Sequence, residues 1–175
     1  SVKLPISNEA VFAKTQEVKT SISSARSDIV LPENVQDGTL PLVLIVEDNQ
    51  DVIQYLTSCL QMHYRLTIAQ DGQEGIDKAL EIIPDLIVSD VMMPRKSGFE
   101  LCEMLKTHQQ SSHIPIVLLT AKADIDSKLA GLNTGADAYL PKPFEKQELL
   151  IRLQKLLELR QKLRYYYTSA DFLNR

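Results

Sequence analysis

Short apolar runs recur along the chain from residue 41 onward, separated by polar and charged positions. Runs of this length that are apolar at nearly every position are typical of parallel strands buried on both faces. Brief alternation of apolar and polar residues also indicates a strand. The predicted strands cover residues 42–46, 64–69, 85–90, 114–120 and 138–140.

The segments between these runs carry apolar residues at the spacing of a helix. This spacing includes the residues Ile53, Leu56, Ile76, Leu80, Leu101, Leu105, Ile125, Leu129 and Leu132. A last, long helix is predicted from about Phe144, and Asp71 with Glu74 three residues later is typical of a helix start. Alternating strands and helices predict an α/β fold, a doubly wound five-stranded parallel sheet with five helices on its two faces.

The two ends of the chain differ from this regular region. Residues 8–40 are rich in polar side chains without a sustained apolar period, which is the composition of a linker. Residues 1–7 alternate as a strand does, and their proline limits that strand to a sheet edge. We therefore predict one domain over residues 41–159 and a helical extension over residues 160–175.

Composition and charge narrow the classes of function. The 175 residues are 44% apolar and carry a formal net charge of −4, which argues against a disordered chain and against direct nucleic acid binding by this segment. No apolar run approaches the roughly 18 residues that span a bilayer, so we expect a cytoplasmic segment without membrane contact. Cys59 and Cys102 lie in helical patterns and are expected to be reduced core thiols.

Polar side chains that can take part in binding or catalysis lie at the ends of four predicted strands. Glu47 and Asp48 follow the first strand, and Asp90 closes the third. Thr120 closes the fourth strand, and Lys142 follows the fifth. Because ligands bind outside the carboxyl ends of parallel strands, these residues are expected to form one site.

Three neighbouring carboxylates repel one another and require a cation. All-oxygen ligands select a hard ion, so the predicted cofactor is Mg²⁺. With Lys142 and Thr120 contacting further phosphoryl oxygens, the pattern predicts a phosphoryl-transfer site. The sequence has no glycine-rich nucleotide motif and no Ser-His or Cys-His pairing, so the predicted nucleophile is a carboxylate that forms an acyl phosphate.

Short motifs surround these residues in a characteristic order. They are Val46-Glu47-Asp48-Asn49, Val88-Ser89-Asp90-Val91-Met92-Met93-Pro94 with Gly98, Leu119-Thr120-Ala121, Gly135-Ala136-Asp137-Ala138-Tyr139 and Pro141-Lys142-Pro143-Phe144. Together they resemble the response-regulator receiver domain of bacterial two-component signalling, which has a flavodoxin-like fold. The resemblance covers about residues 41–159.

This resemblance implies a role for each acidic residue. Asp90 is implied as the phosphoacceptor, which receives the phosphoryl group of a kinase phosphohistidine in a Mg²⁺-dependent reaction. The resemblance implies that Glu47 and Asp48 bind the metal together with Asp90. It also implies that the backbone carbonyl of Met92 completes the set of metal ligands.

The resemblance also implies a conformational switch. Thr120 and Tyr139 would be the switch pair, with Ala121 beside them at the phosphate, and Lys142 would bind the phosphate next to a cis peptide at Pro143. Phosphorylation adds negative charge and acceptor oxygens, so Thr120 gains a hydrogen bond by moving toward the group and vacates space for Tyr139. The surface of the fourth helix, fifth strand and fifth helix is expected to change.

Two flanking positions bear on the lifetime of the acyl phosphate. Met92 lies two residues after Asp90, and Lys122 lies two residues after Thr120. A thioether makes no useful hydrogen bond to an attacking water, and an ammonium group cannot accept its proton. We therefore expect slow hydrolysis, suited to an output such as transcription.

The flanking segments indicate a larger parent protein. Residues 1–7 resemble the closing strand of the ATP-binding domain of sensor histidine kinases. This resemblance predicts that the segment belongs to a hybrid kinase. The segment itself is expected in the cytoplasm, and the full-length kinase could be anchored in the inner membrane. The predicted partners are a histidine-kinase dimerisation and phosphotransfer domain, in the same or another chain, and a downstream output domain joined to residues 160–175. Arg160 interrupts an apolar seam of the last helix, so at most a weak homodimer is expected.

Two alternatives remain open at the level of sequence. One is a stand-alone response regulator that acts by binding a partner. The other is a phosphatase of the haloacid-dehalogenase type, which also uses a strand-end aspartate and Mg²⁺. Such an enzyme needs a second aspartate two positions after the nucleophile, where this chain has Met92, and it is therefore disfavoured.

Overall fold

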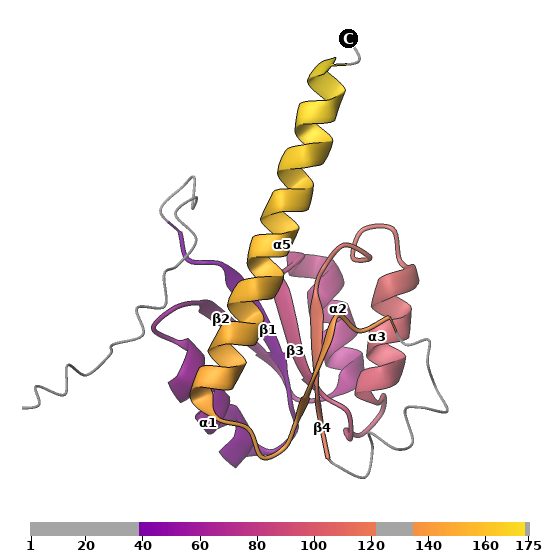
Figure 1. Cartoon of the computed structure of the whole chain (residues 1–175). Coiled ribbons are helices and arrows are strands. Elements are labelled where there is room, and N and C mark those ends of the chain that lie inside the picture. Colours follow the sequence, from indigo (N-terminus) through magenta and orange to yellow (C-terminus); the bar gives the residue numbers. More distant parts are fainter. Residues whose placement is uncertain (1–38, 122–134, 174–175) are drawn as a thin grey trace, which may run out of the picture.

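The computed structural model describes residues 39–121 and 135–173, which form a five-stranded parallel sheet (Figure 1). The order of the strands across the sheet is β2-β1-β3-β4-β5. The strands are β1 (Leu42–Val46), β2 (Arg65–Ala69), β3 (Leu86–Asp90), β4 (Ile116–Thr120) and β5 (Ala138–Pro141). The predicted sheet and its parallel direction are confirmed.

Four helices lie within the described residues, and they cover both faces of the sheet (Figure 1). They are α1 (Gln50–Leu60), α2 (Gly72–Ile82), α3 (Gly98–Thr107) and α5 (Lys146–Leu173). Helices α1 and α5 pack on one face, and α2 and α3 pack on the other. The predicted helix around Ile125, Leu129 and Leu132 falls outside the described residues.

Each face of the sheet has its own apolar core, because successive residues of a strand point to opposite faces. Val43 and Ile45 of β1 belong to the core under α1 and α5, whereas Leu44 and Val46 belong to the core under α2 and α3. All four side chains are fully buried. This two-sided burial explains why β1 has no polar position.

Both cysteines are buried in these cores as free thiols, which confirms their prediction. Cys59 packs in the core under α1 and Cys102 in the core under α3. Burial raises the pKa of the Cys102 thiol to about 12, so this thiol stays protonated and unreactive at neutral pH.

Three strands begin later than the sequence predicts: β2 and β3 by one residue each, and β4 by two. Asp85 precedes β3 and uses its Oδ2 to accept the backbone N–H of Leu42 at 2.8 Å, which caps the neighbouring strand β1. Strand β4 begins at Ile116, since the N–H of Ile114 donates to Ser111 in a turn and Pro115 has no N–H to donate.

The starts of the helices follow their local sequences. Asp71 is the N-cap of α2, as predicted, and accepts the N–H of Glu74 at 2.9 Å. The Glu74 carboxylate accepts the N–H of Gln70 rather than that of the cap residue. Ser97 and Glu100 form a reciprocal capping box at the start of α3.

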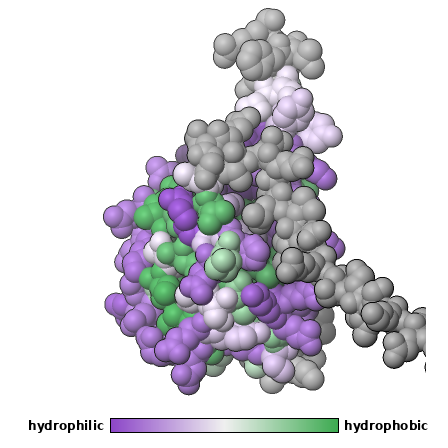
Figure 2. Space-filling model, turned by 90° about the vertical axis from the view of Figure 1, so that its left-hand side faces the viewer, coloured by the Kyte–Doolittle hydropathy of each residue, from purple (hydrophilic) through white to green (hydrophobic). Residues whose placement is uncertain are grey.

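Helix α5 is longer than the sheet that it covers. It has 28 residues, or about 42 Å at 1.5 Å per residue, and begins at Lys146 rather than at Phe144. Its first turns bury Leu149 and Leu153 against the sheet, and its distal half projects from the body (Figure 1). Figure 2 shows part of the projecting segment in white to pale purple, the colours of intermediate hydropathy.

Arg160 marks the point where α5 leaves the body. Its guanidinium donates to the backbone carbonyl of Asp85 and lies 3.5 Å from the Asp85 carboxylate, at the amino end of β3. Arg160 therefore attaches the helix to the sheet, and beyond it Leu163 and Tyr167 are exposed. Among the described helices, none combines the length and hydropathy needed to cross a membrane.

Candidate functional site

The carboxyl ends of the strands bring the predicted site residues together. Glu47 and Asp48 directly follow β1, and Asp90 is the last residue of the central strand β3. Carboxylate oxygens of these three residues all lie within 4.8 Å of one another. Glu47 and Asp90 are buried, whereas Asp48 is exposed at the rim.

Lys142 brings a positive charge into this acidic cluster from the loop after β5. Its Nζ lies 3.1 Å from Oδ1 of Asp90 and 3.5 Å from Oε2 of Glu47. The backbone N–H of Lys142 donates to the carbonyl of Thr120 at 2.7 Å, which holds the loop to the end of β4. The peptide bond between Lys142 and Pro143 is cis, the form that the resemblance implies.

The cluster has more negative than positive charge. Burial raises the pKa of Glu47, and the negative charge of Asp90 raises it further. The N–H of Asn49, 3.0 Å from Glu47 Oε1, and the ammonium of Lys142 only partly oppose this shift. An all-oxygen cluster with this excess of negative charge fits Mg²⁺.

A buried hydroxyl without a hydrogen-bond partner stands beside the cluster. Thr120 is fully buried at the end of β4, and its Oγ1 has no partner within the described part of the chain. Buried polar groups are normally paired, because an unpaired one costs about 1–3 kcal/mol. The hydroxyl is thus available to a ligand that brings an acceptor oxygen.

Tyr139 lies on β5, the strand next to Thr120. It pairs in register with Leu118, two residues before Thr120, and its half-buried ring packs against the core under α2 and α3. Ala121 follows β4 and is exposed at the same edge. The structure therefore places the predicted switch pair on neighbouring strands.

The loop between β3 and α3 carries the remaining described candidate, Met92, which is exposed two residues after Asp90. The N–H of Val91 donates to Oδ1 of Asp90 at 2.8 Å and orients this carboxylate. Lys122 lies outside the described residues, so the effect of Met92 and Lys122 on the acyl phosphate lifetime stays a prediction.

An ion pair that the sequence did not reveal attaches this loop to α2. Arg95 has a left-handed backbone conformation (φ 64°), and its guanidinium pairs with the carboxylate of Asp71. Arg95 first, and then the N–H of Glu74, lower the pKa of Asp71. An arginine in the sequence gives no sign of a left-handed backbone conformation. Its ion-pair partner is also 24 residues away, so no local motif predicts the pair.

The ion pair predicts a stability change that depends on pH. An Asp71→Asn variant keeps an N-cap acceptor but loses the charge, so its free energy of unfolding should fall by about 0.5–1 kcal/mol at pH 7. A lowered pKa stabilises the fold above the unfolded-state value of about 3.9, and this contribution disappears as the pH falls through the folded-state pKa. Urea unfolding should show that the difference in free energy of unfolding between wild type and Asp71→Asn becomes smaller below about pH 4. A difference of constant size down to pH 3 would contradict a stabilising ion pair between Arg95 and Asp71.

Comparison with known proteins identifies the family. A family model described as the response regulator receiver domain matches residues 43–154. The chain belongs to this family. As a receiver domain it is a phosphoacceptor of two-component signalling, and its acidic cluster is of the kind that such a site requires.

Relatives of the receiver domain occur in two kinds of protein. Hybrid signal transduction histidine kinase D of Dictyostelium discoideum is 42% identical over 142 residues, which cover 81% of this chain and 9% of the relative. Histidine kinase P4 of Formosa agariphila is 38% identical over 131 residues, 75% of this chain and 10% of the relative. Response regulator ArlR of Staphylococcus aureus is 42% identical over 116 residues, 66% of this chain and 52% of the relative. The chain thus spans about a tenth of these kinases and about half of this regulator.

Solved structures agree with the family. The signal receiver domain of a histidine kinase from Syntrophus aciditrophicus is 33% identical with a TM-score of 0.64, and the match covers 67% of this chain and 90% of that one. The chemotaxis response regulator CheY4 of Vibrio cholerae is 35% identical with a TM-score of 0.62, covering 67% of this chain and 99% of that one.

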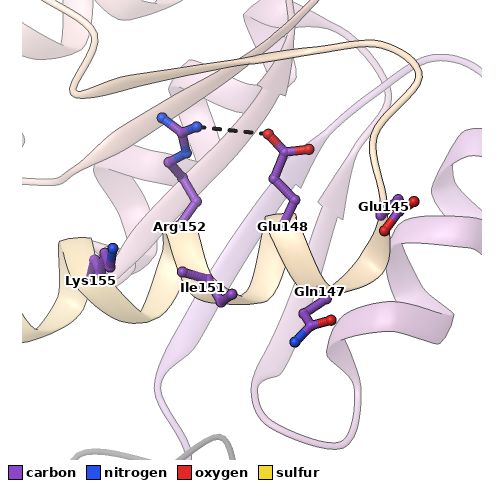
Figure 3. Close-up of a pocket in the computed structure, with 6 residues that line it drawn as sticks. All are labelled: Glu145, Gln147, Glu148, Ile151, Arg152 and Lys155. Carbon is purple, nitrogen blue, oxygen red and sulfur yellow. Dashed lines mark ion pairs between the residues drawn. The ribbon is translucent and has the colours of Figure 1, made fainter. Parts of the chain in front are cut away.

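A shallow hollow of about 550 Å³ lies elsewhere, along the start of α5 (Figure 3). Its side chains project from the first turns of α5 and from Glu145 just before the helix, with Glu148 and Arg152 paired at 3.8 Å. The hollow contains none of the strand-end residues. We therefore place the chemistry at the carboxylate cluster and not in the hollow.

Proposed function

We propose that Asp90 is the residue of this receiver domain that is phosphorylated. Among the three carboxylates, Glu47 is only 1% exposed and too enclosed to meet a donor, while Asp48 lies at the exposed rim. Asp90, at 9% exposure, is less enclosed than Glu47 and forms the shorter ion pair to Lys142, at 3.1 Å, and this is the observation that carries the proposal.

In the proposed reaction, an Asp90 carboxylate oxygen attacks the phosphorus of a phosphohistidine. An oxygen–phosphorus bond forms, the phosphorus–nitrogen bond breaks, and its electron pair returns to the imidazole nitrogen. Lys142 would hold one phosphoryl oxygen, and the N–H of Val91 orients the attacking carboxylate.

We propose Mg²⁺ as the cofactor, held by Glu47, Asp48, Asp90 and the backbone carbonyl of Met92. The mutual proximity of the three carboxylates and the burial of two of them support this. When bound, the ion neutralises negative charge on the transferred phosphoryl group.

The unpaired hydroxyl of Thr120 supports the proposed switch. A phosphoryl group on Asp90 would supply the acceptor that this hydroxyl lacks, and its movement would give Tyr139 room to turn. The changed surface would be that of β5, α5 and the predicted fourth helix, which falls outside the described residues.

We propose that the receiver domain operates in the cytoplasm within a hybrid histidine kinase. The two kinase relatives and the resemblance of residues 1–7 to a kinase strand support this context. Its phosphodonor would be a dimerisation and phosphotransfer domain, and the projecting part of α5 would lead to an output domain. The match to a response regulator keeps the stand-alone alternative open.

The assignment of Asp90 is tested with a small acyl phosphate and Mg²⁺, followed by measurement of the intact mass. Wild type should gain one phosphoryl group, and Asp90→Asn should gain none. Asp77→Asn, which changes an exposed carboxylate on α2, is the matched control and should react as wild type does. A phosphoryl adduct on Asp90→Asn would refute the assignment.

A further inference from the structure

A contact between α1 and the loop after β5 connects two segments that are 89 residues apart. The hydroxyl of Tyr55 donates to the backbone carbonyl of Phe144 at 3.2 Å. The two aromatic rings also pack together, with centroids 5.9 Å apart. Tyr55 is 43% exposed, so burial of its ring in the core does not explain this arrangement.

The loop end of this contact lies next to the phosphate-binding lysine. Phe144 is two residues after Lys142 and two residues before α5 begins. At Lys142, the backbone N–H is held by Thr120. Pro143 has no N–H with which to hold the loop. The hydrogen bond from Tyr55 to Phe144 therefore restrains the loop on the C-terminal side of Lys142.

The other end of the contact lies on the helix that starts at the acid pair. Asn49 is the N-cap of α1, and its backbone N–H donates to Glu47 at 3.0 Å. Its side chain accepts the N–H of Asp51 at 2.9 Å. The start of α1 is thus fixed relative to Glu47, and Tyr55 lies on the second turn of the same helix.

We propose that Tyr55 is a positioning residue for Lys142. By attaching the loop to α1, Tyr55 holds the ammonium group at its observed distances from Asp90 and Glu47, where it can meet the phosphoryl group. Tyr55 itself lies outside the reacting atoms and acts through Lys142. This inference rests on the proposed roles of Asp90 and Lys142.

The test is a Tyr55→Phe variant, which removes the hydroxyl and keeps the ring contact. Phosphorylation by a small acyl phosphate is followed over a range of donor concentrations at saturating Mg²⁺, because a small donor does not depend on kinase docking. We expect the limiting rate constant to fall about threefold to tenfold, the effect of one lost hydrogen bond. The Mg²⁺ dissociation constant should not change. Tyr165→Phe, on the projecting part of α5, is the matched control and should behave as wild type.

A double-variant cycle separates positioning from a general structural effect. In a Lys142→Met background, Tyr55→Phe should cause no further loss, since the group that it positions is absent. A loss of the same size in both backgrounds, or a wild-type rate constant for Tyr55→Phe, would overturn the inference. Failure of the proposed function would be recognised separately, by phosphorylation of Asp90→Asn or by a wild-type rate for Lys142→Met alone.

Discussion

Replacing Lys142 with Met is expected to lower the rate constant of phosphorylation by about 100-fold, the usual effect of removing one preorganised charge from a reacting group. Lys142 is the cation that contacts both Asp90 and Glu47 among the described residues. In its absence, no cation of the protein offsets the repulsion between an incoming phosphoryl group and the carboxylates at this site, among the described residues.

The rate is measured by intact mass after reaction with a small acyl phosphate at saturating Mg²⁺. Lys162→Met, on the exposed part of α5, is the control for loss of a lysine and should leave the rate unchanged. The Mg²⁺ affinity of Lys142→Met should be equal to or tighter than that of wild type, because a competing cation has been removed. A weaker affinity would show that Lys142 supports the acidic cluster rather than the phosphoryl group.

Replacing Gly98 with Ala should destabilise the domain by about 3 kcal/mol or more, at the upper end of the cost of overpacking. A Cβ on Gly98 would lie 2.2 Å from the backbone carbonyl oxygen of Asp90 and 3.0 Å from the Cα of Val91. Both are backbone atoms, so no side-chain rotation can relieve the clash. The strand end that carries Asp90 would have to shift.

Chemical unfolding measures this loss, and phosphorylation should slow in parallel. Glu103→Ala changes an exposed position of the same helix and should alter the free energy of unfolding by less than about 0.5 kcal/mol. A Gly98→Ala protein as stable as wild type would mean that β3 and α3 can separate without cost.

Local patterns in the sequence were sufficient to predict the sheet, its parallel direction and the side chains that lie together at its carboxyl edge. A strand buried on both faces is apolar at nearly every position, and this makes β1 recognisable without any tertiary contact. Because parallel strands end at one edge, Glu47, Asp90 and Lys142 could be placed together from their positions alone. The distances among them in the structure agree with that placement.

Strand boundaries were predicted less well, and the reason is physical. Asp85 resembles the first residue of a strand in sequence, but its side chain is used to cap β1. Asp137 caps β4 in the same way, by accepting the N–H of Ile116 at 2.8 Å, although here the predicted start of β5 at Ala138 is confirmed. Whether an aspartate continues a strand or caps its neighbour depends on which strand lies beside it.

The sequence by itself therefore determined the order of the elements, the two-sided burial of the sheet and the edge at which acids and lysine meet. Only the tertiary structure decided the contacts that restrain this framework: Tyr55 with Phe144, Arg95 with Asp71, and Arg160 with Asp85. Partners in these contacts are 24 to 89 residues apart. Their residue types are common on any protein surface, so no local period or motif marks them. Each pair forms because the packed helices and loops bring its two members within reach.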